Sequence, residues 1–198
     1  MLDKELDMGP GLYAESFFSY YSTFRCLNVS NSIESGGESL DGAEFTRRVL
    51  KAERKLYRIA YSILWNDQDC CDAAQETMAK AWQYKDKLYS EAYFDTWLVR
   101  ILINECRKLL KKRSGDVSEL DEDIPAPSRD RERDIDLADA LLKLPEKYRL
   151  PTLLHYLEGY SLKEIARILR IPESKVKSRL HQARGKLRDL LGGEDYEA

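Results

Sequence analysis

Side chains that build catalytic and metal centres are scarce in this sequence. Its 198 residues include only two histidines and four cysteines, and the cysteines form no CxxC pair. Neither a disulfide framework nor a zinc site is therefore indicated. The two histidines lie far apart, and scattered carboxylates complete no set of nucleophile, base or metal ligands around them. We expect the protein not to be an enzyme and to carry no cofactor and no metal ion.

Long apolar runs are missing as well. No stretch approaches the roughly 18 uncharged apolar residues of a membrane span. The N-terminus also lacks a basic segment followed by an apolar one, which a secretory signal requires. We therefore expect a cytoplasmic protein with no membrane insertion. A composition of 43% hydrophobic and 34% charged residues is typical of a globular chain with one domain or two small ones.

The net charge of −3 conceals a segregation of charge along the chain. Residues 43–113 hold 15 Lys and Arg against 10 Asp and Glu, and residues 137–191 hold 12 against 6. The other segments are acidic, with 2 against 7 in residues 1–42, 3 against 9 in 114–136 and none against 3 in 192–198. A solvated surface explains either basic block alone, but two amphipathic basic modules favour a negatively charged partner.

The acidic segments have the composition of linkers and tails. Segment 114–136 contains Pro125 and Pro127 and too few apolar residues to bury a core, so we interpret it as a flexible linker. Residues 1–42 are expected to be a poorly ordered N-terminal extension, although the aromatic stretch 12–24 is compatible with a short helix. The last seven positions form an acidic tail.

Helical periodicity runs through the first basic module. The stretch EFTRRVLKAERKLYRIAYSIL has apolar residues at steps of three and four, which predicts a helix facing a core. A second helix, DCCDAAQETMAKAWQY, turns Ala74, Met78 and Ala81 inward. A third, FDTWLVRILINECRKLLKKR, has an apolar face and a separate polar face that suits a phosphate backbone, with Asn104 free to meet a base.

The second basic module has the pattern of a helix-turn-helix. Pro145 suits the first turn of a helix, and Pro151 is expected to kink that helix or delay its start. Ser161 and Glu164 have the spacing of a capping box before the next helix, and a short turn at 170–174 precedes the last one. A plain helical hairpin predicts the same core. Polar residues near the start of the last helix favour a helix that enters the major groove of DNA.

Together these stretches resemble the extracytoplasmic-function (ECF) class of bacterial RNA polymerase sigma factors. The resemblance covers roughly residues 43–191, and its motifs occur in the family's order: DCCDAAQETMAKAW, FDTWLVRILINECRKLLKK, LPEKYR and EGYSLKEIARILRIPESKVKSRLHQARGKL. It implies an all-α fold of two small helical domains, region 2 at 43–113 and the region 4 helix-turn-helix at 137–191, joined by the flexible acidic linker.

The function implied by the resemblance is promoter-specific transcription initiation. Such a protein binds core RNA polymerase, recognises the −35 and −10 promoter elements and assists strand opening. The alternative is a helix-turn-helix regulator that does not join the polymerase, which would share only the last motif. Because the resemblance begins near Leu40, residues 1–42 are expected to be a dispensable arm or an upstream region outside the protein proper.

The resemblance also implies protein partners. In this family the second helix of region 2 docks on the clamp helices of the largest catalytic subunit of the polymerase, and region 4 meets the flap. An anti-sigma factor is a further expected partner. The implied polymerase-binding residues are Asp72, Gln75, Glu76 and Lys80.

For the −10 element, the family uses the loop before the third helix and that helix's first turns, which hold a base flipped from the non-template strand. The corresponding loop is residues 87–93. Aromatic stacking is worth about 1–3 kcal/mol per base, although ordinary core packing also explains Phe94 and Trp97. The implied −10 residues are Tyr93, Phe94, Trp97, Arg100, Asn104, Lys108 and Lys111.

For the −35 element, the family reads bases with the second helix of the helix-turn-helix. We expect Lys177 and Gln182 to read bases, and Arg179 and Arg184 to hold phosphates; His181 is either a reader or an exposed bystander. Gln182 stands where the family frequently has Arg, and Gln favours adenine where Arg favours guanine. The implied −35 residues are Lys175, Lys177, Ser178, Arg179, His181, Gln182 and Arg184.

Overall fold

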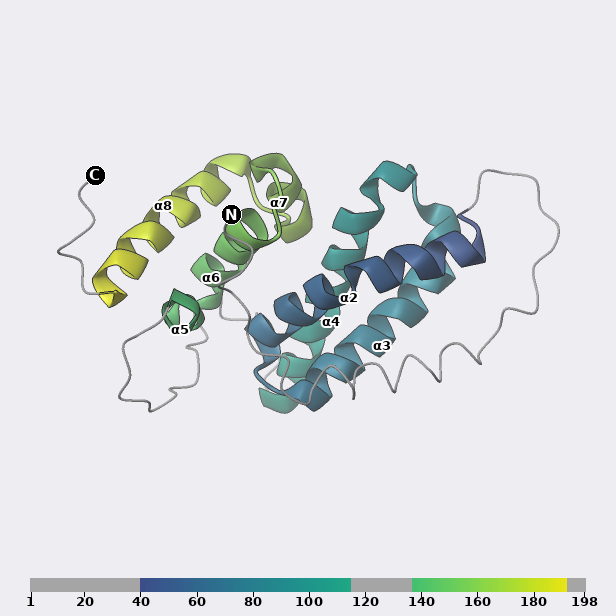
Figure 1. Ribbon diagram of the computed structural model, residues 1–198, viewed down its shortest axis with the longest axis horizontal. Coiled ribbons are helices and arrows are strands. Elements are labelled where there is room, and N and C mark those ends of the chain that lie inside the picture. Colours follow the sequence, from purple (N-terminus) through teal and green to yellow (C-terminus); the bar gives the residue numbers. More distant parts are fainter. Residues whose placement is uncertain (1–39, 115–136, 192–198) are drawn as a thin grey trace.

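The computed structural model describes residues 40–114 and 137–191, and these form two groups of helices (Figure 1). The expected N-terminal extension up to residue 39, the linker from residue 115 and the acidic tail lie outside the described residues. The first group consists of α2 (Gly42–Leu64), α3 (Asp67–Tyr84), the 3-10 turns η1 (Lys85–Lys87) and η2 (Glu91–Tyr93), and α4 (Phe94–Ser114). The second consists of α5 (Leu137–Lys143), α6 (Glu146–Thr152), the π-helical turn η3 (Leu153–Leu157), α7 (Leu162–Leu169) and α8 (Glu173–Leu190). The described ranges contain no strand, which confirms the all-α prediction.

Local chemistry sets the break between α2 and α3. Trp65 adopts a left-handed conformation with φ 57°, and its N–H donates to the Tyr61 carbonyl, which ends α2. The side chain of Asn66 then accepts a hydrogen bond from the Asp69 N–H at 2.9 Å, which caps the start of α3. The two helices therefore turn back on each other within a few residues.

The core of the first group lies between α2, α3 and α4. The predicted apolar stripe of α2 is buried along its whole length, and Ala74, Met78 and Ala81 point inward from α3 as predicted. The small side chains of α3 let its backbone approach the other two helices. Aromatic rings close the end of this core, where Phe45 meets Phe94 edge to face with ring centroids 5.7 Å apart.

In the second group, a proline inside a helix produces a π turn. Pro151 lies within α6 and has no N–H to donate, and the following turn Leu153–Leu157 widens to i→i+5 bonding, with the Glu158 N–H donating to the Leu153 carbonyl at 3.1 Å. The predicted kink thus takes the form of a change in helical register. The predicted capping box is confirmed, since Ser161 and Glu164 exchange hydrogen bonds of 2.8 and 3.3 Å.

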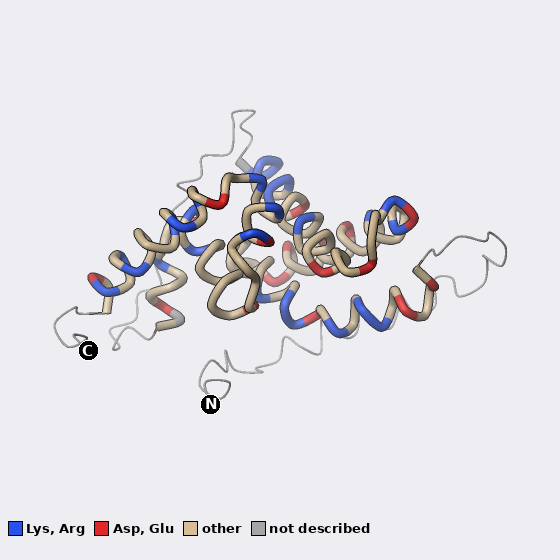
Figure 2. The backbone as a smooth tube through the Cα atoms, turned by 90° about the horizontal axis from the view of Figure 1, so that it is seen from above, with Lys and Arg blue, Asp and Glu red and all other residues tan. Residues whose placement is uncertain are grey.

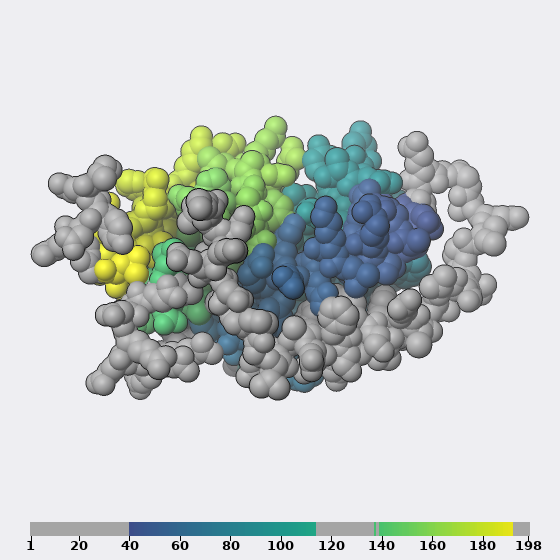
Figure 3. All heavy atoms as spheres, in the orientation of Figure 1, coloured from purple at the N-terminus to yellow at the C-terminus, as the bar shows by residue number. Residues whose placement is uncertain are grey.

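The two groups pack against each other, a feature that the flexible-linker interpretation did not predict. Figure 3 shows their atoms in contact on the face in view. Arg149 of α6 is 2% exposed; its Nε donates to the Ser62 carbonyl of α2 at 2.8 Å, and its Nη1 donates to the carbonyls of Leu142 and Leu144. Its guanidinium lies 4.9 Å from the centre of the Trp65 ring. One buried arginine therefore links the backbones of both groups, and its burial lowers its pKa to about 10.

A second set of contacts lies at the edge of the same interface. Arg58 of α2 makes a two-pronged ion pair with Glu158 at 2.8 and 3.1 Å, and the Glu158 side chain is almost fully buried. Arg107 of α4 reaches Glu146 of α6 at 2.9 Å. Buried apolar residues of both groups form one continuous cluster around these pairs. The interface is therefore packed and charge-matched.

Candidate nucleic-acid and protein interfaces

Helix α8 presents a polar face along its first turns, as the helix-turn-helix interpretation predicts. Arg170, in a left-handed conformation with φ 55°, ends α7, and Pro172 precedes α8. The exposed side chains on α8 include Lys175, Lys177, Ser178, His181, Gln182 and Arg184. Basic residues follow this helix in Figure 2. The structure therefore brings six of the seven predicted −35 residues to the surface of one helix.

Arg179 is the exception, and its predicted outward position is wrong. Its side chain is only 7% exposed and lines a small cavity with Glu146, Leu169 and Arg107, between α4, α6, α7 and α8. The helical period explains this position. Arg179 lies one turn from Val176 and Ala183, which are both fully buried, so it falls inside the apolar arc of α8.

The polar face of α4 is exposed where the sequence predicts it. Asn104, Lys108 and Lys111 are exposed at helical spacing, and Arg100 is half-buried one turn before them. Lys108 also pairs with Glu105 at 3.2 Å. Asn104 contributes an exposed amide to this face. An exposed amide presents a donor and an acceptor together, as base recognition requires.

The aromatic residues at the start of α4 do not behave alike. Phe94 is 2% exposed and Trp97 is half-buried against the same core, as the core-packing alternative predicts for both residues. The edge-to-face contact with Phe45 makes Phe94 a core residue. Tyr93 remains 43% exposed.

Tyr89 is the aromatic residue that the sequence-based list missed. It lies in the loop between η1 and η2, is 96% exposed and thus presents both faces of its ring to solvent. Tyr84, at the end of α3, is 41% exposed, with the Lys87 ammonium 4.8 Å from its ring centre. A signal was available in the sequence: Tyr89 belongs to no helical apolar stripe and stands in a short loop.

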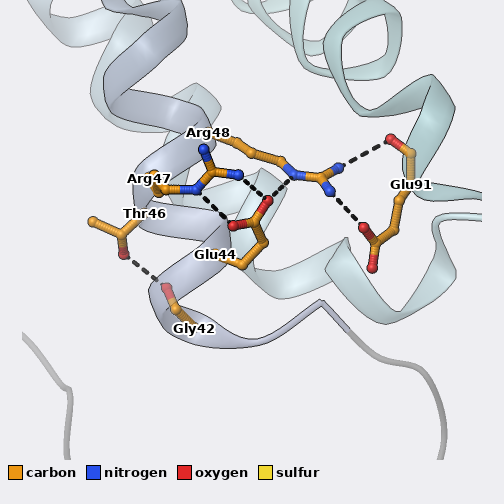
Figure 4. Close-up of polar contacts among 6 residues, drawn as sticks. All are labelled: Gly42, Glu44, Thr46, Arg47, Arg48 and Glu91. Atoms are coloured by element: carbon orange, nitrogen blue, oxygen red, sulfur yellow. Dashed lines mark hydrogen bonds and ion pairs between the residues drawn. The ribbon is translucent and has the colours of Figure 1, made fainter.

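The loop that carries Tyr89 is held at its far end by an arginine of α2 (Figure 4). Arg48 donates to the Glu91 carbonyl at 3.1 Å and to the Glu91 carboxylate at 2.5 Å. Glu44 accepts from both Arg47 and Arg48, and these hydrogen bonds lower the pKa of Glu44 to about 2. The end of the loop is therefore fixed relative to α2, while its tip is free to contact a ligand.

The outer face of α3 is acidic and polar. Asp72, Gln75 and Glu76 are exposed, as predicted, opposite the buried alanines. Lys80 is half-buried and pairs with the buried Glu105 of α4 at 2.5 Å. Burial alone raises the pKa of Glu105, but hydrogen bonds from Lys80 and Lys108 bring it below its ordinary value. Lys80 therefore joins α3 to α4 at the edge of this face.

Helix α7 packs against α4. The Arg167 guanidinium is 5.3 Å from the centre of the Tyr93 ring. Lys55 of α2 connects both groups, since its ammonium lies 2.6 Å from the Asp95 carboxylate and 3.3 Å from the Tyr160 hydroxyl. The surface predicted for the −10 element thus meets the second group of helices.

The described ranges, residues 40–114 and 137–191, carry neither a metal-binding cluster nor a membrane-spanning helix. These ranges hold no group of three or more His, Cys, Asp and Glu side chains placed to bind a metal ion. None of their helices has the length and apolar character needed to cross a membrane. Cys70 and Cys106 are buried as free thiols, and burial raises the pKa of each.

Comparison with known proteins identifies the family of this chain. The model of sigma-70 region 2 matches residues 49–115, and that of sigma-70 region 4 matches residues 134–187. The ECF RNA polymerase sigma factor SigM of Mycobacterium tuberculosis is 31% identical over 156 residues, which cover 77% of this chain and 79% of that protein. The chain belongs to the ECF RNA polymerase sigma factors.

Other members of the family support the same assignment. SigW of Bacillus subtilis is 32% identical over 156 residues, covering 69% of this sigma factor and 83% of SigW. The solved structure of RpoE in complex with the anti-sigma factor NepR, from Bartonella quintana, has a TM-score of 0.60 and 26% identity, covering 75% of this chain and 97% of that one. The predicted family, sigma factor function and two-domain helical fold are confirmed. A regulator that does not join the polymerase is not favoured.

Proposed function

We propose that this sigma factor docks on core RNA polymerase through the outer face of α3 and reads promoters with α4 and α8. The observation that carries the proposal is the presence, in one chain, of two exposed polar helix faces on separate domains. Asn104 marks the face on α4, and Gln182 marks the face on α8. Each combines amide or hydroxyl groups with flanking cations, which suits base edges between phosphates.

At the −10 element, we assign base stacking to the loop before α4 and contacts with base edges and phosphates to α4 itself. Tyr89 stacks on a base flipped from the non-template strand, because its ring is exposed and its loop is fixed at Glu91. Stacking of about 1–3 kcal/mol per base offsets much of the few kcal/mol that base flipping requires. Asn104 meets a base edge, while Lys108 and Lys111 lie along the backbone.

Reading both elements at once requires the two domains to separate. The −10 and −35 elements lie about 25 base pairs apart, roughly 85 Å at a rise of about 3.4 Å per pair. A compact body of this size is only about 40 Å across. A chain of the length of segment 115–136 spans up to about 75 Å when extended. The packed arrangement is therefore a closed form, and the contacts of Arg149 oppose promoter binding.

The proposed partners follow from the exposed surfaces. Asp72, Gln75 and Glu76 contact the clamp helices of the largest polymerase subunit, and region 4 meets the flap. An anti-sigma factor is a further proposed partner, since the similar sigma factor RpoE of Bartonella quintana was co-crystallised with the anti-sigma factor NepR. The protein acts in the cytoplasm as an initiation factor and has no catalytic activity of its own.

Two substitutions on α8 test the proposed reading of the −35 element. Gln182→Ala should reduce discrimination at one base pair by about 1–3 kcal/mol and leave the other positions nearly unchanged. Arg184→Ala should weaken binding to all sequences alike and lower the slope of log affinity against log salt by about one unit. The measurement is binding of the holoenzyme to a library of −35 variants at two salt concentrations.

The two variants serve as controls for each other, because both remove one exposed polar side chain from the same helix. An unchanged preference profile for Gln182→Ala would show that this face does not read the base there. If neither variant altered binding, α8 would be a solvated helix with no role at the −35 element.

A further inference from the structure

The amide of Gln182 is already held in place before any DNA is bound. Its Oε1 accepts a hydrogen bond from the Tyr148 hydroxyl at 2.8 Å, and its Nε2 donates to the Ser178 hydroxyl at 3.2 Å. Ser178 lies one turn earlier on α8, whereas Tyr148 comes from α6. Two contacts from different helices fix both ends of one amide group, so its plane and direction are set by the domain.

The ring of Tyr148 is anchored, so its hydroxyl is a fixed point. The ring packs against the small apolar cluster of region 4, which includes Leu144, Ala183 and Leu187. The ammonium groups of Lys147 and Lys186 lie 5.3 and 5.5 Å from the ring centre. A ring held by packing and by two cations loses little further freedom when its hydroxyl makes a hydrogen bond.

The existing contacts use only part of the hydrogen-bonding capacity of the Gln182 amide. A glutamine amide has two N–H donors and two lone pairs, and the internal bonds use one of each. One donor and one acceptor remain on the same amide group. Adenine presents the complementary pair in the major groove, an acceptor at N7 and a donor at N6.

We propose that Tyr148 is a positioning residue that sets the base preference of this sigma factor by orienting the Gln182 amide. The inference rests on the proposed reading of the −35 element by α8. Tyr148 acts through Gln182: it holds Oε1 on the side that accepts from adenine N6 and so directs the free N–H toward N7. Without the hydroxyl, the amide is free to rotate and to present its groups in either order, which weakens the discrimination between adenine and the other bases.

The test is a double-mutant cycle on base preference. Four proteins are compared as holoenzymes on a library of −35 variants: the parent, Tyr148→Phe, Gln182→Ala and the double variant. Tyr148→Phe removes one oxygen and keeps the packed ring. It should lower the preference for adenine at the Gln182 position by about 2- to 10-fold, the range expected for one net hydrogen bond. In the Gln182→Ala background, the same change should have no effect on the profile.

Tyr156→Phe is the matched control. Tyr156 lies on η3 of the same domain and is 55% exposed, so this variant loses an equivalent hydroxyl away from α8. It should keep the parent profile. A melting curve for each variant separates loss of preference from loss of folding, because a merely structural role for Tyr148 would change stability and leave the relative preferences intact.

The possible outcomes are distinct. A parental profile for Tyr148→Phe, together with an altered one for Gln182→Ala, would overturn the positioning role and leave the proposed function standing. A loss of affinity for all sequences that persists in the Gln182→Ala background would also overturn it, because the hydroxyl would then hold a phosphate directly. If Gln182→Ala itself kept the parental profile, base reading by Gln182 would fail and the positioning role would fail with it.

Discussion

Replacing Arg149 with alanine should lower the free energy of unfolding by about 3 kcal/mol. The arginine is almost fully buried, and its removal leaves the carbonyls of Ser62, Leu142 and Leu144 without their donor. Because the first of these belongs to region 2 and the others to region 4, the variant should also weaken the packing of the two domains. Denaturant unfolding, followed together with small-angle scattering of the native state, measures both effects.

Arg54→Ala is the control for this prediction. Arg54 lies on α2 and is exposed, so its loss should change the free energy of unfolding by no more than about 0.5 kcal/mol. Arg149→Lys keeps the charge but lacks the planar fork that reaches several carbonyls, so it should rescue only part of the stability. An Arg149→Ala protein as stable and as compact as the parent would show that this residue does not hold the domains together.

Reversing the charge on the outer face of α3 should abolish most polymerase binding. Glu76 is exposed beside Gln75 on a helix whose opposite face is filled with buried alanines, so Glu76→Lys should leave the fold intact. A misplaced like charge in a protein interface costs several kcal/mol, so affinity for core polymerase should fall at least about tenfold. Pull-down of core polymerase by the tagged protein, with a circular-dichroism melt, provides the measurement.

Asp189→Lys is the matched charge reversal. Asp189 is exposed near the end of α8, in the other domain, and the substitution alters net charge by the same amount. It should retain polymerase binding. Equal recovery of polymerase by Glu76→Lys and by the parent would mean that this face of α3 does not bind the polymerase. The docking site would then lie elsewhere on the protein.

Much of the fold follows from local patterns in the sequence. The apolar stripe of α2, the inward alanines of α3 and the capping box at Ser161 each depend on residues a few positions apart, and each is found as predicted. The error at Arg179 was avoidable by the same reasoning. Charge suggested an outward position, whereas the helical period places Arg179 between two buried turns. Periodicity is therefore the better guide to which side of a helix a residue occupies.

Other features have no local signature. The partner of Arg149 in region 2 is a backbone carbonyl 87 positions earlier, and every residue has such a carbonyl, so no residue type marks the contact. Phe94 and Tyr89 are both aromatic residues near the −10 loop, yet one is buried and the other almost fully exposed. Tyr89 could have been recognised from its place outside every apolar stripe, whereas nothing local marks the contact of Arg149. The exposed faces of α4 and α8 could be predicted, whereas the packing of one domain on the other could not.

Transcription by the reconstituted holoenzyme tests the central claim most directly. Core RNA polymerase of the same organism is mixed with the full chain on fragments of its genome, and the 5′ ends of the transcripts are mapped. The account predicts copurification of the chain with core polymerase and new start sites that share sequences near −10 and −35 and are absent with core alone. If the chain bound DNA but neither copurified with core polymerase nor changed the start sites, it would be a regulator that does not join the polymerase, and the account would be contradicted.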